Sequence, residues 1–345
     1  MLQAFDTLPN DLLETDSREL GAVLGAPTLI HLDGAREPPL FVSVLMHGNE
    51  TVGWDAIRSL LSERLERFGE LRLPRALSLF IGNVTAAASG VRRLPGQPDY
   101  NRVWPGSPVA PTLEHDLMAR VVAIMAERGV FASLDLHNNT GVNPHYACIN
   151  VIDNRFLRLA TLFSRTVVYF IRPAGVQSMA MARLCPAVTV ECGKVGDQQG
   201  LEHARSFIDA ALHLTEIPAE PLAPQDIDLY HTVAQVRVPE DVDFSFSVGD
   251  GELILDPELE RMNFCELPPG TLFATCRGND GIGLDVRDEL GQDVGARFFS
   301  LDQGQLRLRQ AVMPSMLTLD ETVIRQDCLC YLMERYGRHV PQRAR

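Results

Sequence analysis

The stretch 40–67, LFVSVLMHGNETVGWDAIRSLLSERLER, contains the basic unit of the fold in one piece. Its first seven residues, 40–46, are apolar and rich in β-branched side chains, which is typical of a strand buried on both faces. Residues 51–67 then repeat apolar side chains at helical spacing. Gly48 and Asn49 lie between the two segments and permit a tight turn. The stretch therefore predicts a buried strand that leads directly into a helix.

The same alternation continues through the first two thirds of the chain. We expect further buried strands at 76–82, 131–136, 147–152, 166–171 and 187–191. Helices are expected between them at 113–128, 154–164 and 201–214. Strands that alternate with helices predict an α/β fold with a mixed, largely parallel sheet flanked by helices.

The pattern changes at residue 217, where IPAEPLAPQ carries three prolines and is typical of a linker. Short strands broken by Gly, Asp and Pro are expected beyond it, at 232–238, 251–255, 271–275 and 305–312. A final helix is expected at 323–336. We therefore predict two domains, a catalytic domain at 1–216 and a smaller, all-β C-terminal domain at 217–345.

Composition excludes several classes of protein. Hydrophobic residues make up 46% and charged residues 22% of the 345-residue chain, as in soluble enzymes. No apolar run approaches the roughly 20 residues of a membrane span, and the acidic N-terminus is unlike a signal peptide, so we expect a cytoplasmic protein. The net charge of −14 argues against nucleic acid or a membrane as a partner. The seven cysteines lack a CxxC pair and are expected to be reduced core residues.

His47 and Glu50 follow the first strand across the Gly48 turn. Strand ends and helix starts converge on the ligand-binding edge of an α/β sheet. An imidazole and a carboxylate three residues apart can reach one Zn²⁺, which accepts N and O ligands at about 2 Å. We therefore expect both to bind metal. A second His-x-x-Glu, His213 to Glu216, ends an expected helix with no strand before it, so we expect it on the surface.

Two later strand ends supply a third ligand and a base. Asp135 and His137 alternate along the strand at 131–136, so their side chains point to the same side. His137 would complete the ligand set and leave the open position that a catalytic zinc needs, while Asp135 would orient an imidazole through its second nitrogen. Glu191 follows the apolar run 187–190. A partly desolvated carboxylate there binds a proton more readily, which suits a general base.

Arginines gather in and after the loop 82–93. Arg92 and Arg93 end this loop, and the segment DYNR that follows contains Asn101 and Arg102. Guanidinium groups bind carboxylates through two parallel hydrogen bonds and stabilise an oxyanion that forms on a carbonyl. In a chain this acidic, we expect the loop to contact an anionic substrate.

Five motifs in order resemble the aspartoacylase and succinylglutamate desuccinylase family: HGNE at 47–50, GVRR at 90–93, DYNR at 99–102, DLHNNTG at 135–141 and VECG at 190–193. The resemblance covers roughly residues 40–320 and implies a zinc carboxypeptidase-like fold. It assigns one zinc ion to His47, Glu50 and His137, general base and acid catalysis to Glu191, the carbonyl-polarising role to Arg92, and binding of the substrate carboxylate to Asn101 and Arg102. Because Arg92 lies about two residues farther from Asn101 than is usual, Arg93 is the alternative to Arg92.

The resemblance implies zinc-dependent hydrolysis of the amide bond of a small-molecule N-acyl amino acid. A family arginine falls near Met181, with Arg183 the nearest arginine, and a late family tyrosine has no counterpart here. Both differences favour a less acidic substrate than N-acetylaspartate. Two alternatives stay open, a zinc carboxypeptidase that acts on short peptides and a non-catalytic zinc-binding protein. The sequence also leaves open the physiological metal and whether the chain forms a homo-oligomer.

Overall fold

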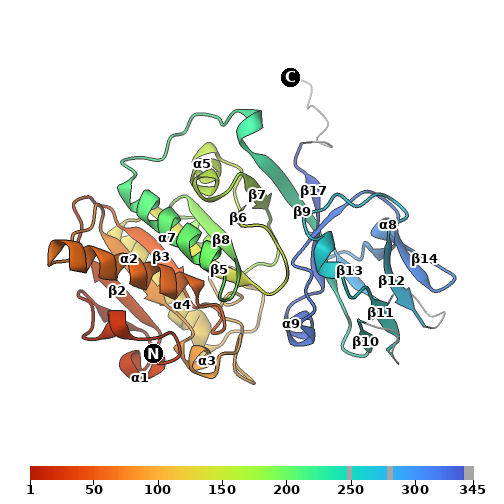
Figure 1. The fold of residues 1–345 in the computed structure, drawn as a ribbon, viewed down its shortest axis with the longest axis horizontal. Helices are drawn as coiled ribbons and strands as arrows, with labels where there is room; N and C mark the ends of the chain where they lie inside the picture. The colour runs from red at the N-terminus through yellow and green to blue at the C-terminus, as the bar shows by residue number, and fades with distance from the viewer. Residues whose placement is uncertain (247–250, 278–282, 338–345) are drawn as a thin grey trace. The chain divides into compact units, whose positions relative to one another are not determined.

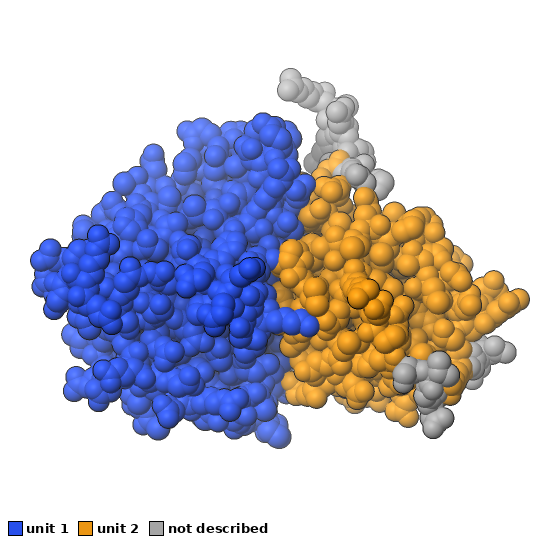
Figure 2. All heavy atoms as spheres, viewed as in Figure 1, with its two compact units in different colours: residues 1–138, 145–169, 173–228 blue, residues 139–144, 170–172, 229–345 orange. Residues whose placement is uncertain are grey.

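The structure is a computed structural model that describes residues 1–246, 251–277 and 283–337. It divides into two compact units, which Figure 2 shows in different colours. The first unit comprises 1–138, 145–169 and 173–228, and the second comprises 139–144, 170–172 and 229–345. Residues 338–345, at the end of the domain expected at 217–345, lie outside the described part of the chain. The boundary expected between 216 and 217 stays a prediction.

The first unit is built on a mixed sheet with the strand order β1-β2-β4-β3-β5-β8-β6-β7. The strands are β1 Gln3–Phe5, β2 Thr28–Leu32, β3 Leu40–Val44, β4 Leu77–Ile81, β5 Ala132–Asn139, β6 Tyr146–Ile149, β7 Thr166–Tyr169 and β8 Ala187–Lys194. The central strand β3 runs parallel to both β4 and β5. The pairs β2–β4 and β6–β8 are antiparallel. Every residue of β3, β4 and of β8 as far as Gly193 is buried, as the continuous apolar runs predict.

Helices flank this sheet. They are α1 Leu20–Leu24, α2 Val52–Phe68, α3 Val84–Ser89, α4 Leu113–Arg128, α5 Asn154–Phe163, α6 Gln177–Met181 and α7 Gln198–His213. Helices α2 and α7 pack side by side over the sheet (Figure 1). Trp54, Ile57 and Leu61 form the buried stripe of α2 at helical spacing, and Gly69 ends the helix with a left-handed φ of 71°.

The second unit consists mainly of β-strands. They are β9 Asp228–Arg237, β10 Phe244–Ser245, β11 Leu253–Leu255, β12 Leu272–Cys276, β13 Asp285–Arg287, β14 Phe299–Asp302, β15 Gln305–Leu308, β16 Met313–Ser315 and β17 Cys330–Arg335, with the short helices α8 Gly295–Phe298 and α9 Glu321–Gln326. Strands β10-β11-β12-β15-β14 form a five-stranded sheet. Strand β9 pairs with β13 and β17, and β17 pairs with β16. The apolar core of this unit includes Val236, Phe273, Phe298 and Leu332.

The fold class predicted from the sequence is confirmed: a mixed, largely parallel sheet flanked by helices, with a separate β-rich part at the C-terminus. The prediction of a final helix at 323–336 is wrong. Helix α9 ends at Gln326, and residues 330–335 form strand β17. The apolar side chains of Cys330 and Leu332 alternate at strand spacing, and β9 supplies an antiparallel partner that local propensity cannot reveal. Strands β1, β2, β10, β13, β14 and β16 were not predicted.

Among the described residues, no helix combines the length and the apolar character needed to cross a membrane. Five of the seven cysteines are buried: Cys148, Cys185, Cys192, Cys328 and Cys330. Cys276 is half-buried, and Cys265 is exposed.

Candidate metal centre

The turn after β3 brings His47 and Glu50 together. Strand β3 ends at Val44, and Leu45 then adopts a left-handed conformation with φ 56°. The Glu50 amide donates to the His47 carbonyl at 3.1 Å, which closes the turn. Only glycine fits at position 48, because a Cβ there would lie 2.2 Å from the Ala87 backbone nitrogen on α3. The sequence-predicted turn is therefore fixed by contact with a distant helix.

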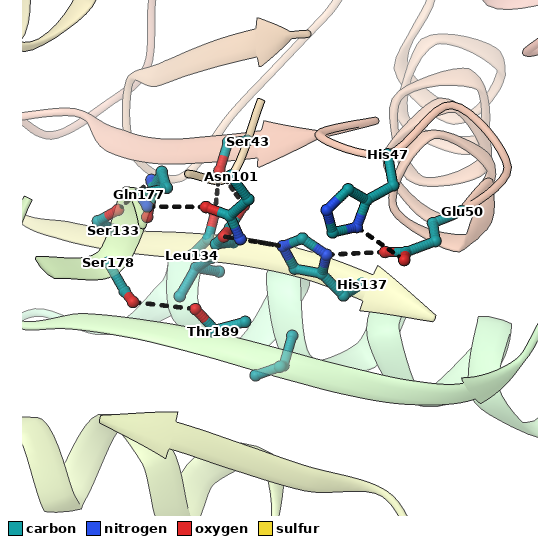
Figure 3. Close-up of polar contacts among 12 residues, drawn as sticks. Ser43, His47, Glu50, Asn101, Ser133, Leu134, His137, Gln177, Ser178 and Thr189 are labelled. Carbon is teal, nitrogen blue, oxygen red and sulfur yellow. Dashed lines mark hydrogen bonds and ion pairs between the residues drawn. The ribbon is translucent and has the colours of Figure 1, made fainter. Parts of the chain in front are cut away.

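His47, Glu50 and His137 form one buried cluster at the ends of β3 and β5 (Figure 3). One ligand atom of each lies within 4.8 Å of the other two. The Nδ1 atoms of His47 and His137 face the two Glu50 oxygens, at 2.8 Å and 2.7 Å. This set of two nitrogens and one carboxylate is the chemistry that zinc prefers, so the residues fit a zinc ion.

The Nε2 atoms of the two histidines point away from Glu50 and toward carboxylates. His47 Nε2 lies 3.1 Å from Asp99 Oδ1, and His137 Nε2 lies 2.9 Å from Asp135 Oδ2. Metal-binding histidines usually donate their second ring N–H to such a group. The contact of Asp135 with His137 Nε2 has the geometry that the orienting role predicted for Asp135 requires. Asp99 is a residue that the sequence analysis did not single out.

The charges in the cluster are strongly coupled. Burial alone would raise the pKa of Glu50, but the two neighbouring histidines outweigh burial and lower it. Burial also opposes protonation of His137, but Asp135 and Glu50 raise its pKa well above the usual value. The pKa of His47 is raised despite burial and Arg92, because Glu50 and Asp99 favour the imidazolium. Metal and protons therefore compete for these ligands, and metal binding would release protons.

Glu191 lies on β8, opposite Tyr146 of β6. Its side chain is buried, and its Oε2 atom has no hydrogen-bond partner in the described structure. Burial raises the pKa of Glu191 to about 7; the positive charge of His137 opposes this rise, and Glu50 adds to it. A buried carboxylate that titrates near neutrality is typical of a functional site.

Two cysteine thiols lie near Glu191. Burial raises the pKa of Cys148 and of Cys192 well above the usual value, and the charge of Glu191 adds to this effect. Both thiols therefore stay protonated at neutral pH. They are apolar neighbours of the candidate base and lack the thiolate character of a nucleophile.

The arginines of the 82–93 loop are placed differently. Arg92 Nη2 donates to Asp99 Oδ2 at 2.9 Å, and Arg92 Nη1 lies 3.7 Å from Glu50 Oε1. Arg93 instead donates to the Gln97 carbonyl at 3.0 Å. The structure therefore brings Arg92 to the cluster and turns Arg93 toward its own loop.

Asn101 also lies in the cluster, and its amide is engaged by protein groups. Its Nδ2 donates to Asp135 Oδ2 at 3.3 Å and lies 3.2 Å from His137 Nε2, and its Oδ1 accepts from the Gln177 amide at 2.9 Å. Arg102 donates to the Asn101 carbonyl at 2.9 Å. Ser43 donates to the other Asp135 oxygen at 2.7 Å, so hydrogen bonds hold Asp135 on both sides.

Asn138 is a second residue whose part in the site the sequence analysis missed. Its Oδ1 accepts from the Val52 amide at 3.1 Å and so caps α2, whose own N-cap residue Thr51 makes no side-chain cap. Its Nδ2 donates to the Gly193 carbonyl at 2.9 Å. Asn138 is the first asparagine of the HNN run at 137–139, which is visible in the sequence, but its partners lie in two other elements.

The second His-x-x-Glu motif lies on the surface, as predicted. His213 is the last residue of α7 and is exposed, and its Nδ1 is 2.8 Å from the Asp209 carbonyl oxygen. Glu216 is also exposed. This pair takes no part in the cluster.

Comparison with known proteins places the chain in a family. The model of the succinylglutamate desuccinylase/aspartoacylase catalytic domain matches residues 37–215, which is more than half of the chain. The chain belongs to this family. The resemblance inferred from the five motifs is thus confirmed, and the chain belongs to a group of deacylases, which are hydrolases.

Solved structures share the family fold at low sequence identity. A succinylglutamate desuccinylase/aspartoacylase from Rhodobacter sphaeroides is 14% identical with a TM-score of 0.56, covering 89% of this chain and 88% of its own. Murine aminoacylase 3 is 19% identical with a TM-score of 0.51, covering 87% of this chain and 97% of its own. The succinylglutamate desuccinylase of Chromobacterium violaceum is 19% identical with a TM-score of 0.51, covering 82% of this chain and 86% of its own. No curated protein matches the sequence.

Proposed function

We propose that this chain is a zinc-dependent amidohydrolase that cleaves the amide bond of an N-acyl amino acid. One observation carries the proposal: His47, Glu50 and His137 converge in a buried cluster, and their charges act on the buried carboxylate of Glu191, whose Oε2 atom has no hydrogen-bond partner in the described structure. Membership of a deacylase family supports the same reaction class. A protein that only bound zinc would have no use for a buried base of this kind.

His47 Nδ1, His137 Nδ1 and the Glu50 carboxylate would hold one zinc ion per chain. When bound, zinc supplies Lewis acidity, which lowers the pKa of water and polarises a carbonyl group. The protein contributes the ligand set and the carboxylates of Asp99 and Asp135, which fix the ring orientations.

Glu191 is the proposed general base and acid. It takes a proton from the attacking water and returns it to the leaving nitrogen of the amide. A pKa of about 7 suits both steps, because the carboxylate is then neither too weak a base nor too weak an acid at neutral pH. Burial is the main cause of this value.

Arg92 is the proposed donor to the oxyanion that forms on the substrate carbonyl. Its position near Glu50 supports this choice over Arg93, whose guanidinium contacts the Gln97 carbonyl. Arg102 is our proposal for the residue that binds the substrate carboxylate, with Arg93 and Asn101 as further candidates. The amide of Asn101 would have to exchange its contacts with Asp135 and Gln177 to do so.

Metal analysis and a substrate panel test this function together. We expect about one zinc per chain in the wild type, none in His47→Ala, and amine release from at least one N-acyl amino acid. Glu191→Gln should keep its zinc and lose turnover. Dipeptides in the same panel test the carboxypeptidase alternative. Wild-type protein that takes up no zinc, or a Glu191→Gln variant with near-normal turnover, would refute the proposal.

A further inference from the structure

Asp99 contacts a proposed metal ligand and the proposed catalytic arginine at the same time. Its Oδ1 lies 3.1 Å from His47 Nε2, and its Oδ2 accepts from Arg92 Nη2 at 2.9 Å. The side chains of all three are nearly buried, with 11% of Asp99, 6% of His47 and 9% of Arg92 exposed. In a site of such low exposure, each of these ion pairs is weakly screened by solvent.

The first contact determines which nitrogen of His47 is available to a metal. Nδ1 faces Glu50, so it is the atom that would share the metal with this carboxylate. For Nδ1 to offer a lone pair, the ring proton must lie on Nε2. An ionised carboxylate only accepts hydrogen bonds, so Asp99 selects this tautomer. Two further donors hold Asp99 as an acceptor: the Asn101 amide donates to Oδ1 at 2.7 Å, and Arg92 Nη2 donates to Oδ2 at 2.9 Å.

The second contact determines where the positive charge of Arg92 lies. Arg92 Nη1 is 3.7 Å from Glu50 Oε1, which is itself a proposed ligand. A guanidinium released from Asp99 would move toward Glu50 and compete with a metal for its oxygen. Held by Asp99, Arg92 stays beside the cluster with Nη1 directed toward it.

The carboxylate of Asp99 is itself fixed by its own backbone. The Asn101 amide donates to Asp99 Oδ1 at 2.7 Å, and the Arg102 amide donates to the Asp99 carbonyl at 2.9 Å. This turn lies between α3 and α4 and has no strand to support it, so these two bonds define the direction of the side chain.

We propose that Asp99 is a positioning residue that serves the metal centre and Arg92 together: it sets the tautomer of His47 and holds the guanidinium off Glu50. The inference rests on the function proposed above. It also accounts for the place of Arg92 beside the cluster, because the carboxylate that Arg92 bonds also contacts His47.

Zinc affinity tests the first half of this role. In chelator competition on the full chain, Asp99→Asn should bind zinc about 10- to 100-fold more weakly than the wild type. Arg92→Met should not weaken binding, because the contact of His47 with Asp99 remains. Asp285→Asn is the control: Asp285 pairs with Arg287 on β13 in the second unit, so its loss should leave zinc affinity unchanged.

A spectroscopic measurement on the wild type tests the tautomer without any variant. In zinc-loaded protein with ¹⁵N-labelled histidine, His47 should carry its proton on Nε2 and bind through Nδ1. Binding through Nε2 would overturn the proposal, and this result would stand even if Asp99→Asn failed to fold.

Kinetics test the second half. At saturating zinc, Asp99→Asn should lower kcat by up to about 100-fold with a smaller effect on KM, because Arg92 is misplaced. Adding Arg92→Met to Asp99→Asn should then cost less than the product of the two single losses. Multiplicative losses, or wild-type zinc affinity in Asp99→Asn, would overturn the joint role. If the wild type cleaves no N-acyl amino acid, the proposed function fails, while zinc affinity and the His47 spectrum still decide whether Asp99 positions this ligand.

Discussion

Asn138 joins the start of α2 to the end of β8: its side chain accepts from the Val52 amide at 3.1 Å and donates to the Gly193 carbonyl at 2.9 Å. The proposed ligand Glu50 precedes the first of these contacts, and the proposed base Glu191 precedes the second. One buried amide thus fixes the distance between the two elements that carry the chemistry.

Replacing this amide should destabilise the protein. Asn138→Ala leaves a buried N–H and a buried C=O without partners, at about 1–3 kcal/mol each, so we expect a loss of about 2–6 kcal/mol in the free energy of unfolding. Urea denaturation measures this loss in the free energy of unfolding. Asn154→Ala is the control, because its amide bonds the Ala219 carbonyl on the surface. Equal effects of the two substitutions would contradict the bridging role.

Alanine at position 48 should damage the metal turn. The new Cβ would lie 2.2 Å from the Ala87 nitrogen and 2.3 Å from the Ala86 carbonyl carbon, so backbone must move. We expect Gly48→Ala to cost about 3 kcal/mol or more and to weaken zinc binding. Gly69→Ala is the comparison: Gly69 has a φ of +71°, but nothing lies within 4 Å of the new Cβ. That substitution should cost only about 1–2 kcal/mol and leave zinc affinity intact.

The raised pKa of Glu191 predicts how stability depends on pH when metal is removed by a chelator. Folding raises this pKa from 4.5 to about 7, so the folded state binds a proton that the unfolded state has released. Stability from this group is therefore present below about pH 4.5 and is lost as pH rises to about 7, by about 3 kcal/mol. The Glu191→Gln variant should not show this loss of stability as the pH rises. The measurement is the difference between the two proteins in free energy of unfolding at pH 5 and pH 8; the same slope in both would show that Glu191 titrates normally.

Zinc should stabilise only proteins that keep the ligand set. At a free zinc concentration of 100 times Kd, binding to the folded state alone adds about 2.7 kcal/mol. We expect this gain in the wild type and in Glu191→Gln, and its absence in His137→Ala. A Glu191→Gln variant that gained nothing from zinc would mean that Glu191 is itself a ligand and not the base.

The local parts of this protein could be predicted from its sequence. The run 40–67 shows its strand, turn and helix because hydrophobic period and turn chemistry are set within a few residues. The two strand ends that follow it, at His137 and Glu191, were recognisable for the same reason. The assembly of His47, Glu50 and His137 into one cluster followed from a general property of α/β sheets.

The contacts that complete the site could not be predicted, because they join distant segments. Asp99 is 52 residues from His47, and nothing in DYNR marks which residue its carboxylate meets. The partners of Asn138 lie 86 and 55 residues away. Strand β17 was read as a helix for a related reason, since its pairing with β9 depends on a segment about 100 residues earlier in the chain.

The unequal burial of the cysteines offers a practical handle for labelling. Burial keeps Cys148 and Cys192 protonated and out of reach beside Glu191, whereas Cys265 in the second unit is the one thiol of the seven that is exposed. A maleimide dye should therefore attach at Cys265 in the native enzyme and leave the candidate site unmodified. Once the half-buried Cys276 is replaced by serine, a single fluorophore at Cys265 could follow the second unit when zinc or a candidate substrate is added.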